Sequence, residues 1–236
     1  MGTFNANTVR EDARLAELAH CAEERGVEIL GVQEHRRVHH DLIAYCRVGG
    51  CSLITSSTWR NEAQAATGGV GLMLSSRARR ALCRAYQHMG RILIANFDGN
   101  PVTTVMDVYS PTNVALVEDV EKFYEDLRTA IRDVPAHNFL AVLGDFNARL
   151  GPEDARFTYH DATNRNGKHL ATLLAAHELL AANTLFQKRM GKRWTFQDRA
   201  TGILRQLDYI LVRHKRRNSV TNTETYSTFN SVGSDH

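Results

Sequence analysis

Short apolar runs of strand length recur along the chain, and they constrain its fold more than any other feature. VEILGVQE (27–34) and VTTVMDVY (102–109) are rich in β-branched residues and lack a helical period, which is typical of buried strands. Turn residues from Asp98 to Pro101 join the second of these runs to the run before it as a hairpin. We predict further strands at 69–74, 91–97, 138–143 and 206–212, and short ones at 184–186 and 193–197.

Longer segments between these runs carry apolar residues at three- and four-residue spacing, as amphipathic helices do. These segments are 8–25, which ends at Gly26, followed by 117–134 and 170–180. Helices therefore interleave with strands, but the hairpin connections are too numerous for a purely parallel sheet. The sequence predicts an α/β fold, a four-layer sandwich of two mixed, mostly antiparallel β-sheets flanked by helices.

Length and composition indicate one domain over residues 1–236, because 236 residues with 43% hydrophobic content can bury a full core. No stretch approaches the roughly 20 apolar residues that cross a bilayer, and the amino terminus is polar. We therefore expect neither a membrane partner nor a secretory signal. The four cysteines lack zinc-site spacing, which favours free thiols in a reducing, intracellular compartment.

Positive charge is concentrated in one segment. Ten Lys or Arg residues and two Asp residues lie between Gln187 and Arg217, although the net charge of the whole chain is only +3. A basic flank on a less basic body favours a polyanionic partner, with a solvated charged face as the alternative.

Acidic and amide residues gather at the ends of the predicted strands. If those ends meet at one rim, three or four carboxylates converge, and a divalent cation is the natural counter-charge because like charges repel strongly at low dielectric. Oxygen donors favour Mg²⁺ or Mn²⁺ over zinc. The residues concerned are Asn5, Asn7, Glu34, Tyr109, Asp145, Asn147, Asp208, Asp235 and His236.

Single residues of this set also allow purely structural interpretations. Glu34 can cap a loop, and Asn147 can form an Asx-turn. Asp208 can pair with Arg205, three residues before it.

The order and wording of the motifs point further. FNAN (4–7), VQE (32–34), VYSPT (108–112), GDFNA (144–148), QLDYIL (206–211) and SDH (234–236) follow one another along the chain. In this order they resemble the exonuclease–endonuclease–phosphatase superfamily over nearly the whole sequence. TFNA, VQEHR, YSPT and GDFNARLG are most similar to the apurinic-endonuclease-like domain of non-LTR retrotransposons. The resemblance implies a DNase I-like fold and a nuclease that nicks chromosomal DNA.

The resemblance assigns a metal site. Glu34 corresponds to the principal metal-binding carboxylate, Asn5 to a residue beside the metal and the scissile phosphate, and Asp235 to a further acid near the metal. The implied cofactor is Mg²⁺, with Mn²⁺ as the alternative.

The resemblance also assigns catalytic positions. Asp145 corresponds to the aspartate that orients or deprotonates the attacking water, and Asn147 to the amide that holds the phosphate or that water. Tyr109 corresponds to a phosphate contact. His236 corresponds to the histidine that stabilises charge on the phosphoryl oxygen, and Asp208 to the aspartate that orients it. An imidazolium held by a buried carboxylate suits charge stabilisation near neutral pH.

Part of the basic segment is predicted to bind nucleic acid. Lys192, Arg193 and Arg205 can grip phosphates, while Trp194 can wedge against bases or sugars. The alternative is that Trp194 and Phe196 belong to the core.

The function predicted from the sequence is therefore a Mg²⁺-dependent DNA endonuclease that nicks target DNA for retrotransposon integration. DNA is the implied partner, a reverse transcriptase domain of the parent polyprotein a further one, the nucleus the implied location, and a monomer the implied state. The alternatives are a phosphatase of the same superfamily, acting on an inositol phosphate or phospholipid headgroup, and an inactive fragment or binding module. Thr112 and Asn7 depart from the pattern of abasic-site endonucleases. Separately, we expect the domain to be shortened at both ends relative to members of the superfamily.

Overall fold

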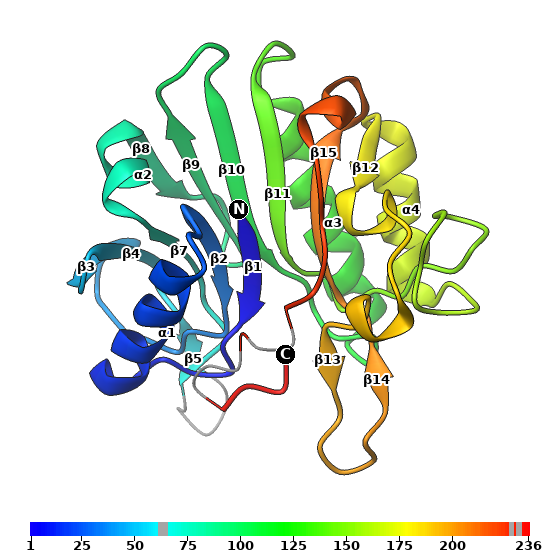
Figure 1. The fold of residues 1–236 in the computed structure, drawn as a ribbon, viewed down its shortest axis with the longest axis horizontal. Helices are drawn as coiled ribbons and strands as arrows, with labels where there is room; N and C mark the ends of the chain where they lie inside the picture. The colour runs from blue at the N-terminus through cyan, green and yellow to red at the C-terminus, as the bar shows by residue number, and fades with distance from the viewer. Residues whose placement is uncertain (61–65, 227–228, 230–232) are drawn as a thin grey trace.

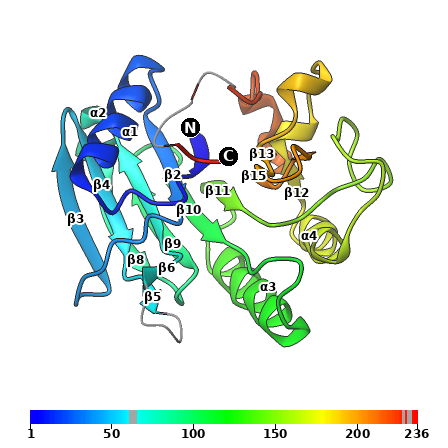
Figure 2. The same ribbon diagram turned by 90° about the horizontal axis from the view of Figure 1, so that it is seen from below.

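Two β-sheets lie face to face, and helices cover their outer faces (Figures 1 and 2). The structure is a computed structural model that describes residues 1–60, 66–226, 229 and 233–236. This arrangement confirms the predicted four-layer α/β sandwich.

The first sheet has five strands, and its first strand pairs in parallel with the second while the other pairs are antiparallel. Its strands, in spatial order, are β1 (Gly2–Asn5), β2 (Ile29–Gln33), β7 (Val70–Leu74), β4 (Cys51–Ser56) and β3 (Ile43–Val48).

The second sheet has six strands, with one parallel pair, β10 and β11, among antiparallel neighbours. Both sheets are thus mixed and mostly antiparallel, as predicted. The strands of this sheet, in spatial order, are β12 (Leu179–Ala181), β15 (Asp208–Arg213), β11 (Phe139–Asp145), β10 (Thr103–Tyr109), β9 (Ile92–Phe97) and β8 (Leu82–Gln87).

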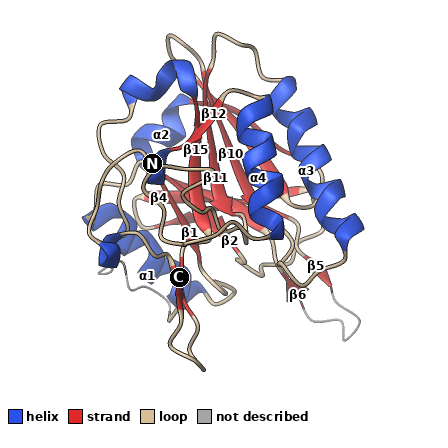
Figure 3. Cartoon of the chain, turned by 90° about the vertical axis from the view of Figure 1, so that its right-hand side faces the viewer, coloured by secondary structure: helices blue, strands red, loops and turns tan. Residues whose placement is uncertain are grey.

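Four α-helices accompany the sheets in the described ranges: α1 (Asp12–Glu24), α2 (Ser76–Ala81), α3 (Val117–Arg132) and α4 (Arg165–Ala176). Figure 3 shows α3 and α4 side by side over the six-stranded sheet. The apolar stripe of α3 is buried, as its spacing predicts; it includes Val120, Phe123, Leu127 and Ile131.

Three apolar clusters fill the three spaces between the layers. One joins α1 to the five-stranded sheet, one joins α3 and α4 to the six-stranded sheet, and the third lies between the two sheets. Because side chains alternate along a strand, each central strand contributes to two clusters. On β10, for example, Met106 and Val108 face α3, while Val105, Asp107 and Tyr109 face the other sheet.

Several predicted boundaries were wrong for local reasons. The first helix begins at Asp12 and not at position 8. α4 begins at Arg165, because the Asn164 side chain accepts a hydrogen bond from Gly167 N and caps the helix there. The short strand predicted at 184–186 is absent, since a 3₁₀ turn, η1 (Ala182–Thr184), ends at residue 184 and a bend follows it.

Short elements complete the described chain. β13 (Phe196–Gln197) and β14 (Leu204–Arg205) form a hairpin, which projects from the body of the molecule in Figure 1. β5 (Trp59–Arg60) pairs with β6 (Ala66–Thr67), and the remaining 3₁₀ turns are η2 (Met190–Lys192) and η3 (His214–Ser219). All four cysteines are free thiols. Within the described ranges, each helix is too short or too polar to cross a bilayer.

Candidate active site

Strand register brings the predicted site residues to one end of the sandwich. In the six-stranded sheet, Tyr109 on β10 pairs with Asp145 on β11, which in turn pairs with Asp208 on β15. In the facing sheet, Asn5 ends β1 and Glu34 directly follows β2. Since β1 and β2 are parallel neighbours, as are β10 and β11, their carboxyl ends meet at the same edge.

Hydrogen bonds from Tyr109 and Asn5 hold Glu34 across the two sheets. Tyr109 Oη donates to Glu34 Oε1 at 2.8 Å, and Asn5 Nδ2 donates to the same oxygen at 3.0 Å. Asn5 Nδ2 also lies 3.0 Å from Asp145 Oδ2. The amide therefore bridges two carboxylates without adding a third negative charge.

Arg36 is a component of the site that the sequence prediction did not include. Its guanidinium donates to Glu34 Oε2 at 2.7 Å and to Asn7 Oδ1 at 2.9 Å. Burial favours the protonated form of Glu34, but hydrogen bonds from Arg36, Asn5 and Tyr109 outweigh it and lower the pKa of this carboxyl. The side chain of Asn7 thus contacts Arg36, a contact that the sequence analysis did not predict.

Asp145 is a buried carboxylate with a raised pKa. Asn147 N donates to its Oδ1 at 2.8 Å, and the Asn147 side chain donates to Ser110 O at 3.0 Å. Burial and the negative charge of Asp208 raise the pKa of Asp145 to about 7, although His236 and the hydrogen bonds oppose the shift. Asp145 can therefore exchange a proton near neutral pH.

His236 and Asp208 form a buried pair. Nδ1 of His236 lies 2.8 Å from Asp208 Oδ2, and its Nε2 lies 3.8 Å from Asp145 Oδ2. Burial alone lowers the pKa of His236, but the charges of Asp208, Asp145 and Asp235 outweigh burial and raise it to about 9. The Phe196 ring packs edge-on against the imidazole at 5.0 Å. His236 is thus cationic at neutral pH and restricted in position.

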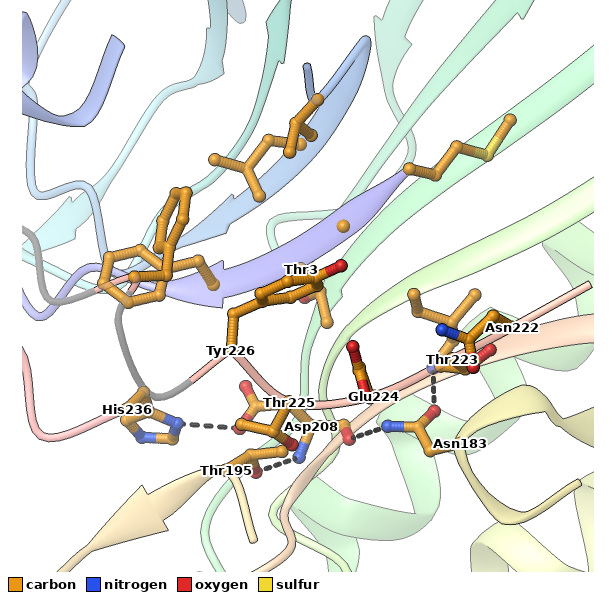
Figure 4. Close-up of a pocket in the computed structure, with 17 residues that line it drawn as sticks. Thr3, Asn183, Thr195, Asp208, Asn222, Thr223, Glu224, Thr225, Tyr226 and His236 are labelled. Carbon is orange, nitrogen blue, oxygen red and sulfur yellow. Dashed lines mark hydrogen bonds and ion pairs between the residues drawn. The ribbon is translucent and has the colours of Figure 1, made fainter. Parts of the chain in front are cut away.

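Main-chain and hydroxyl contacts anchor Asp208 (Figure 4). Its N–H donates to Thr195 Oγ1 at 3.1 Å, and its carbonyl accepts from Asn183 Nδ2 at 3.0 Å. Asp208 and His236 form one wall of a cavity of about 340 Å³ whose other lining residues include Thr3 and Tyr226. The sequence alternative in which Asp208 pairs with Arg205 is wrong, because Asp208 binds His236.

The segment 233–236 returns to the end of β1. Ser234 Oγ donates to Asn5 O at 2.6 Å and accepts from His236 N at 3.1 Å. Asp235 is half-buried, and its carbonyl accepts from Gln197 N at 2.7 Å. Ser234 therefore ties the histidine segment to the strand that carries Asn5.

The donor set fits a hard divalent cation. Asp145, Asp208 and His236 each place one polar atom within 4.8 Å of the others, and the two carboxylates of this group can act as metal ligands while His236 is cationic. Asp208 Oδ1 is buried and has no hydrogen-bond partner, so it retains a free lone pair for an added donor or cation. Glu34 lies one hydrogen-bonded amide away from this group. Carboxylate oxygens are the ligands preferred by Mg²⁺ and Mn²⁺.

Part of the predicted nucleic-acid surface lies at the rim of the site. Arg205 stacks over the Phe196 ring at 5.6 Å and lies 3.7 Å from Asp198. Lys192 lies 5.7 Å from the Tyr226 ring. Both cations belong to the region that adjoins His236 through Phe196 and the cavity wall.

Arg193 serves the fold. Its guanidinium donates to Lys188 O at 2.8 Å and to Thr158 O at 2.9 Å, so this cation is committed to main-chain carbonyls. Trp194 is half-buried next to it.

The last part of the basic segment, residues 213–217, lies at the other end of β15. Arg213 donates to Val134 O at 2.8 Å, Arg216 donates to His137 O at 3.0 Å, and Lys215 donates to Ala136 O. These side chains satisfy carbonyls of the loop between α3 and β11. The concentration of charge seen in the sequence is therefore divided between two ends of the molecule.

The loop after β10 also departs from the expected pattern. Thr112 and Asn113 are exposed, and they contact the start of α4, where Arg165 donates to Thr112 O and Asn166 N donates to Asn113 Oδ1, each at 3.4 Å. Asn113 is thus placed next to α4, and its side chain helps to hold the loop.

Comparisons with known proteins show relatives in sequence and in fold. Craniofacial development protein 2 from Bos taurus is 32% identical over 174 residues, which are 71% of this chain and 29% of that protein, so the chain spans less than a third of the relative's length. The AP endonuclease LMAP from Leishmania major superposes with a TM-score of 0.76 at 14% identity, over 99% of this chain and 84% of that one.

A second solved structure, the endonuclease domain of TRAS1, a telomere-specific non-LTR retrotransposon, superposes with a TM-score of 0.67 at 15% identity, over 99% of this chain and 92% of that one. The profile of the Endonuclease/Exonuclease/phosphatase family matches residues 2–236. The chain therefore belongs to the endonuclease/exonuclease/phosphatase family, whose enzymes hydrolyse phosphodiester and phosphate-ester bonds.

Proposed function

We propose that this protein is a metal-dependent DNA endonuclease that nicks target DNA for retrotransposon integration. The observation that carries the proposal is the convergence of Glu34, Asp145 and His236 at one end of the sandwich, where Asn5 bridges the first two and 3.8 Å separates the last two. Hydrolysis of a phosphodiester needs a base for water, a cation for the phosphoryl oxygens and a fixed geometry, and these side chains supply each part.

Asp145 is the proposed base. With a pKa of about 7, its carboxylate is available at neutral pH and basic enough to accept a proton from water. Asn147 N fixes Asp145 Oδ1, so the other oxygen, which also accepts from Asn5, faces the site. The general base and its support thus come from adjacent residues of one loop.

His236 is the proposed stabiliser of developing charge. Because Asp208 holds Nδ1, the Nε2 atom on the opposite side of the ring faces Asp145 and the reaction site. An imidazolium there can donate to a phosphoryl oxygen as its negative charge grows.

Glu34 is the proposed principal holder of a divalent cation, Mg²⁺ or Mn²⁺, beside the acidic group of Asp145 and Asp208. When bound, such a cation neutralises negative charge on the phosphoryl oxygens and lowers the pKa of bound water. Tyr109 and Asn5 orient the Glu34 carboxylate in the protein itself.

DNA is the proposed substrate because cations and an exposed hairpin adjoin the site. Lys192 and Arg205 lie on this side, and the β13–β14 hairpin carries Arg199 and the exposed Ile203. Phosphate binding by Lys and Arg and wedging by an aliphatic side chain are both typical of DNA-binding surfaces. The AP endonuclease and the retrotransposon endonuclease domain of similar fold support a nuclease. A reverse transcriptase domain on the same polyprotein and a nuclear location belong to the same proposal.

A plasmid assay tests the proposal. Supercoiled DNA incubated with the protein and Mg²⁺ is expected to give the open-circular form, with loss of activity on chelation of the metal and in Asp145→Asn. Phosphate release from inositol phosphates and from phospholipid headgroups is measured in parallel. Phosphate release without nicking would replace the nuclease by the phosphatase alternative, and inactivity toward all three substrates would refute an enzymatic role.

A further inference from the structure

A carboxylate lies in the apolar space between the two sheets, at a position that the proposed mechanism does not use. Asp107 is fully buried in the middle of β10, on the face whose other members include Val105 and Tyr109. Burial of a carboxyl group is costly unless hydrogen bonds compensate for lost water. Burial raises the pKa of Asp107 well above its ordinary value, although hydrogen bonds from Gln33 and Gly71 oppose the shift. A hydrophobic residue would fill this space at lower cost, so a carboxyl group here indicates a specific role.

Two donors from the facing sheet compensate Asp107. Gln33 Nε2 donates to Asp107 Oδ1 at 2.5 Å, and Gly71 N donates to Oδ2 at 3.0 Å. Gln33 Oε1 accepts in turn from Thr3 Oγ1 at 3.2 Å. One carboxylate therefore links β10 to β2 and β7 directly, and to β1 through the Gln33 amide.

The facing sheet is shaped to admit this carboxylate. A Cβ atom added to Gly31 on β2 would lie 2.3 Å from Asp107 Oδ1, which is far inside van der Waals contact. Glycine at position 31 is thus a requirement of the close approach between strand and carboxylate. Gly31 and Gln33 lie on the same face of β2, two residues apart, so the strand offers a gap followed by a donor.

Gln33, a partner of Asp107, and Tyr109, two residues after Asp107 on β10, both lead to Glu34. Gln33 is the last residue of β2, and Glu34 follows it with a left-handed φ of 52°, a conformation that costs energy for a residue other than glycine. On the other side, Tyr109 lies two residues after Asp107 on the same face of β10 and donates to Glu34 Oε1. Asp107 thus contacts Gln33, the residue before Glu34, and lies on β10, the strand that carries Tyr109, the hydrogen-bond partner of Glu34.

We propose that Asp107 is a positioning residue that, through Gln33, places the Glu34 carboxylate for metal binding. The role rests on the proposed function of Glu34, but the placement itself is a property of the protein without metal. Loss of either side chain of the Asp107–Gln33 hydrogen bond is expected to displace Glu34 from Tyr109 and Asn5.

Three variants and a control test the proposal. Asp107→Asn replaces one acceptor by an NH₂ group. Facing Gly71, this group leaves Gly71 N–H without an acceptor; facing Gln33, it requires the Gln33 amide to turn over and give up the bond that Oε1 accepts from Thr3 Oγ1. Gln33→Met keeps the volume and removes the donor, and the double variant completes a cycle. Val105→Ala, on the same face of β10, is the control for a loss of stability without loss of this hydrogen bond.

The readouts are Mn²⁺ affinity without DNA, the denaturant midpoint and crystal structures of the variants. Asp107→Asn and Gln33→Met are each expected to bind Mn²⁺ about 10- to 100-fold more weakly, the range typical of residues that orient metal ligands. The double variant is expected to lose no more Mn²⁺ affinity than the single variant that binds Mn²⁺ more weakly, since both substitutions act through one hydrogen bond. Val105→Ala is expected to lose stability and keep its affinity.

Two results would overturn the proposal. One is Asp107→Asn with unchanged Mn²⁺ affinity; the other is a crystal structure of Asp107→Asn in which Glu34 keeps its hydrogen bonds to Tyr109 and Asn5. If the parent protein binds no Mn²⁺, the proposed function loses its cofactor, whereas the crystal structures still decide the positioning role. If Asp107→Asn does not fold, Gln33→Met carries the same comparison.

Discussion

Nδ1 of His236 lies 2.8 Å from Oδ2 of Asp208, and the two side chains are only 7% and 4% exposed. The pair joins the last described residue to the first residue of β15. Because the carboxylate is buried, it stabilises the imidazolium more strongly than an exposed carboxylate would. The protonation of His236 is therefore a property that Asp208 controls.

The pH dependence of nicking should reflect this control. Activity is expected to fall below about pH 7, because Asp145, the proposed base, becomes protonated. It is also expected to fall above about pH 9, because His236 loses its positive charge. Asp208→Asn is expected to lower the pKa of His236 and move the alkaline limb toward neutral pH. Initial rates across pH 5.5–10 on one plasmid substrate measure both limbs. The control is Asp235→Asn, which removes a charge that raises this pKa less than Asp208 does. An equal shift in both variants would contradict the role of Asp208.

Arg36 should weaken metal binding. Its guanidinium lies 2.7 Å from Glu34 Oε2 and competes with a cation for that carboxylate. Arg36→Ala is expected to tighten Mg²⁺ binding roughly five- to tenfold, because a unit charge about 4 Å away is worth about 1 kcal/mol even at the dielectric of water. Calorimetric titration measures the change. Arg37→Ala, which removes an ion pair with Asp12 at 3.0 Å, is the matched control and should leave the affinity unchanged.

Lys192 should contribute to DNA binding, and Arg217 should not. Lys192 lies on the side of His236, whereas the exposed Arg217 belongs to η3 beyond the far end of β15. Lys192→Ala is expected to lower DNA affinity and to reduce the slope of log K against log salt by about 0.9, the value for one lost phosphate contact. Fluorescence anisotropy at several salt concentrations gives the slope. An equal effect of Arg217→Ala would indicate that DNA affinity depends on the total charge and not on the position of Lys192, and would contradict the prediction.

His35 should make the fold acid-sensitive. Burial lowers the pKa of this histidine to about 3, so the folded state holds it neutral while the unfolded state takes up a proton below its ordinary pKa of 6.5. The stabilisation is complete above pH 6.5 and is lost as the pH falls, by about 1.4 kcal/mol per pH unit at most. At pH 5 the free energy of unfolding is expected to be about 2 kcal/mol lower than at pH 7.5 from this group.

Urea unfolding of His35→Gln at both pH values isolates the effect. The variant is expected to be less stable at pH 7.5, since Arg37 N donates to His35 Nδ1 at 3.0 Å, but to lose less stability on acidification. His40→Gln, at an exposed histidine, is the control, and between pH 7.5 and pH 5 it should lose as much free energy of unfolding as the parent protein does. An equal loss of free energy of unfolding between pH 7.5 and pH 5 in His35→Gln and in the parent protein would refute the assignment.

Strand ends were the part of the site that the sequence could predict. Tyr109, Asp145 and Asp208 close or open apolar runs whose period is clear, and parallel or antiparallel pairing then aligns them. The sequence prediction missed β3, β4, β8 and α2. β3 and β8 are largely exposed or half-exposed and α2 spans only Ser76–Ala81, whereas β4 is buried along its whole length. Tertiary contacts decide such elements more than local propensity does.

The residues that the sequence could not assign depend on partners from distant strands. Arg36 acquires its role from its contact with Asn7, and Asp107 acquires its role from Gln33 and Gly71 on two other strands. Arg36 stands in the VQEHR motif without an assigned role, and Asp107 stands outside the motifs. Buried polar residues become interpretable only when their donors and acceptors are known.

The alignment of Tyr109, Asp145 and Asp208 has a consequence for sequence drift. Successive side chains of a strand point to opposite faces, so a one-residue shift of β11 would turn the Asp145 carboxylate away from Glu34 and toward the helices. The phenol or acid must therefore keep its face at the last position of β10 and β11 and at the first position of β15. Insertions and deletions in this lineage should be confined to the loops, and single-residue length changes inside β10, β11 or β15 should abolish function even in a protein that still folds.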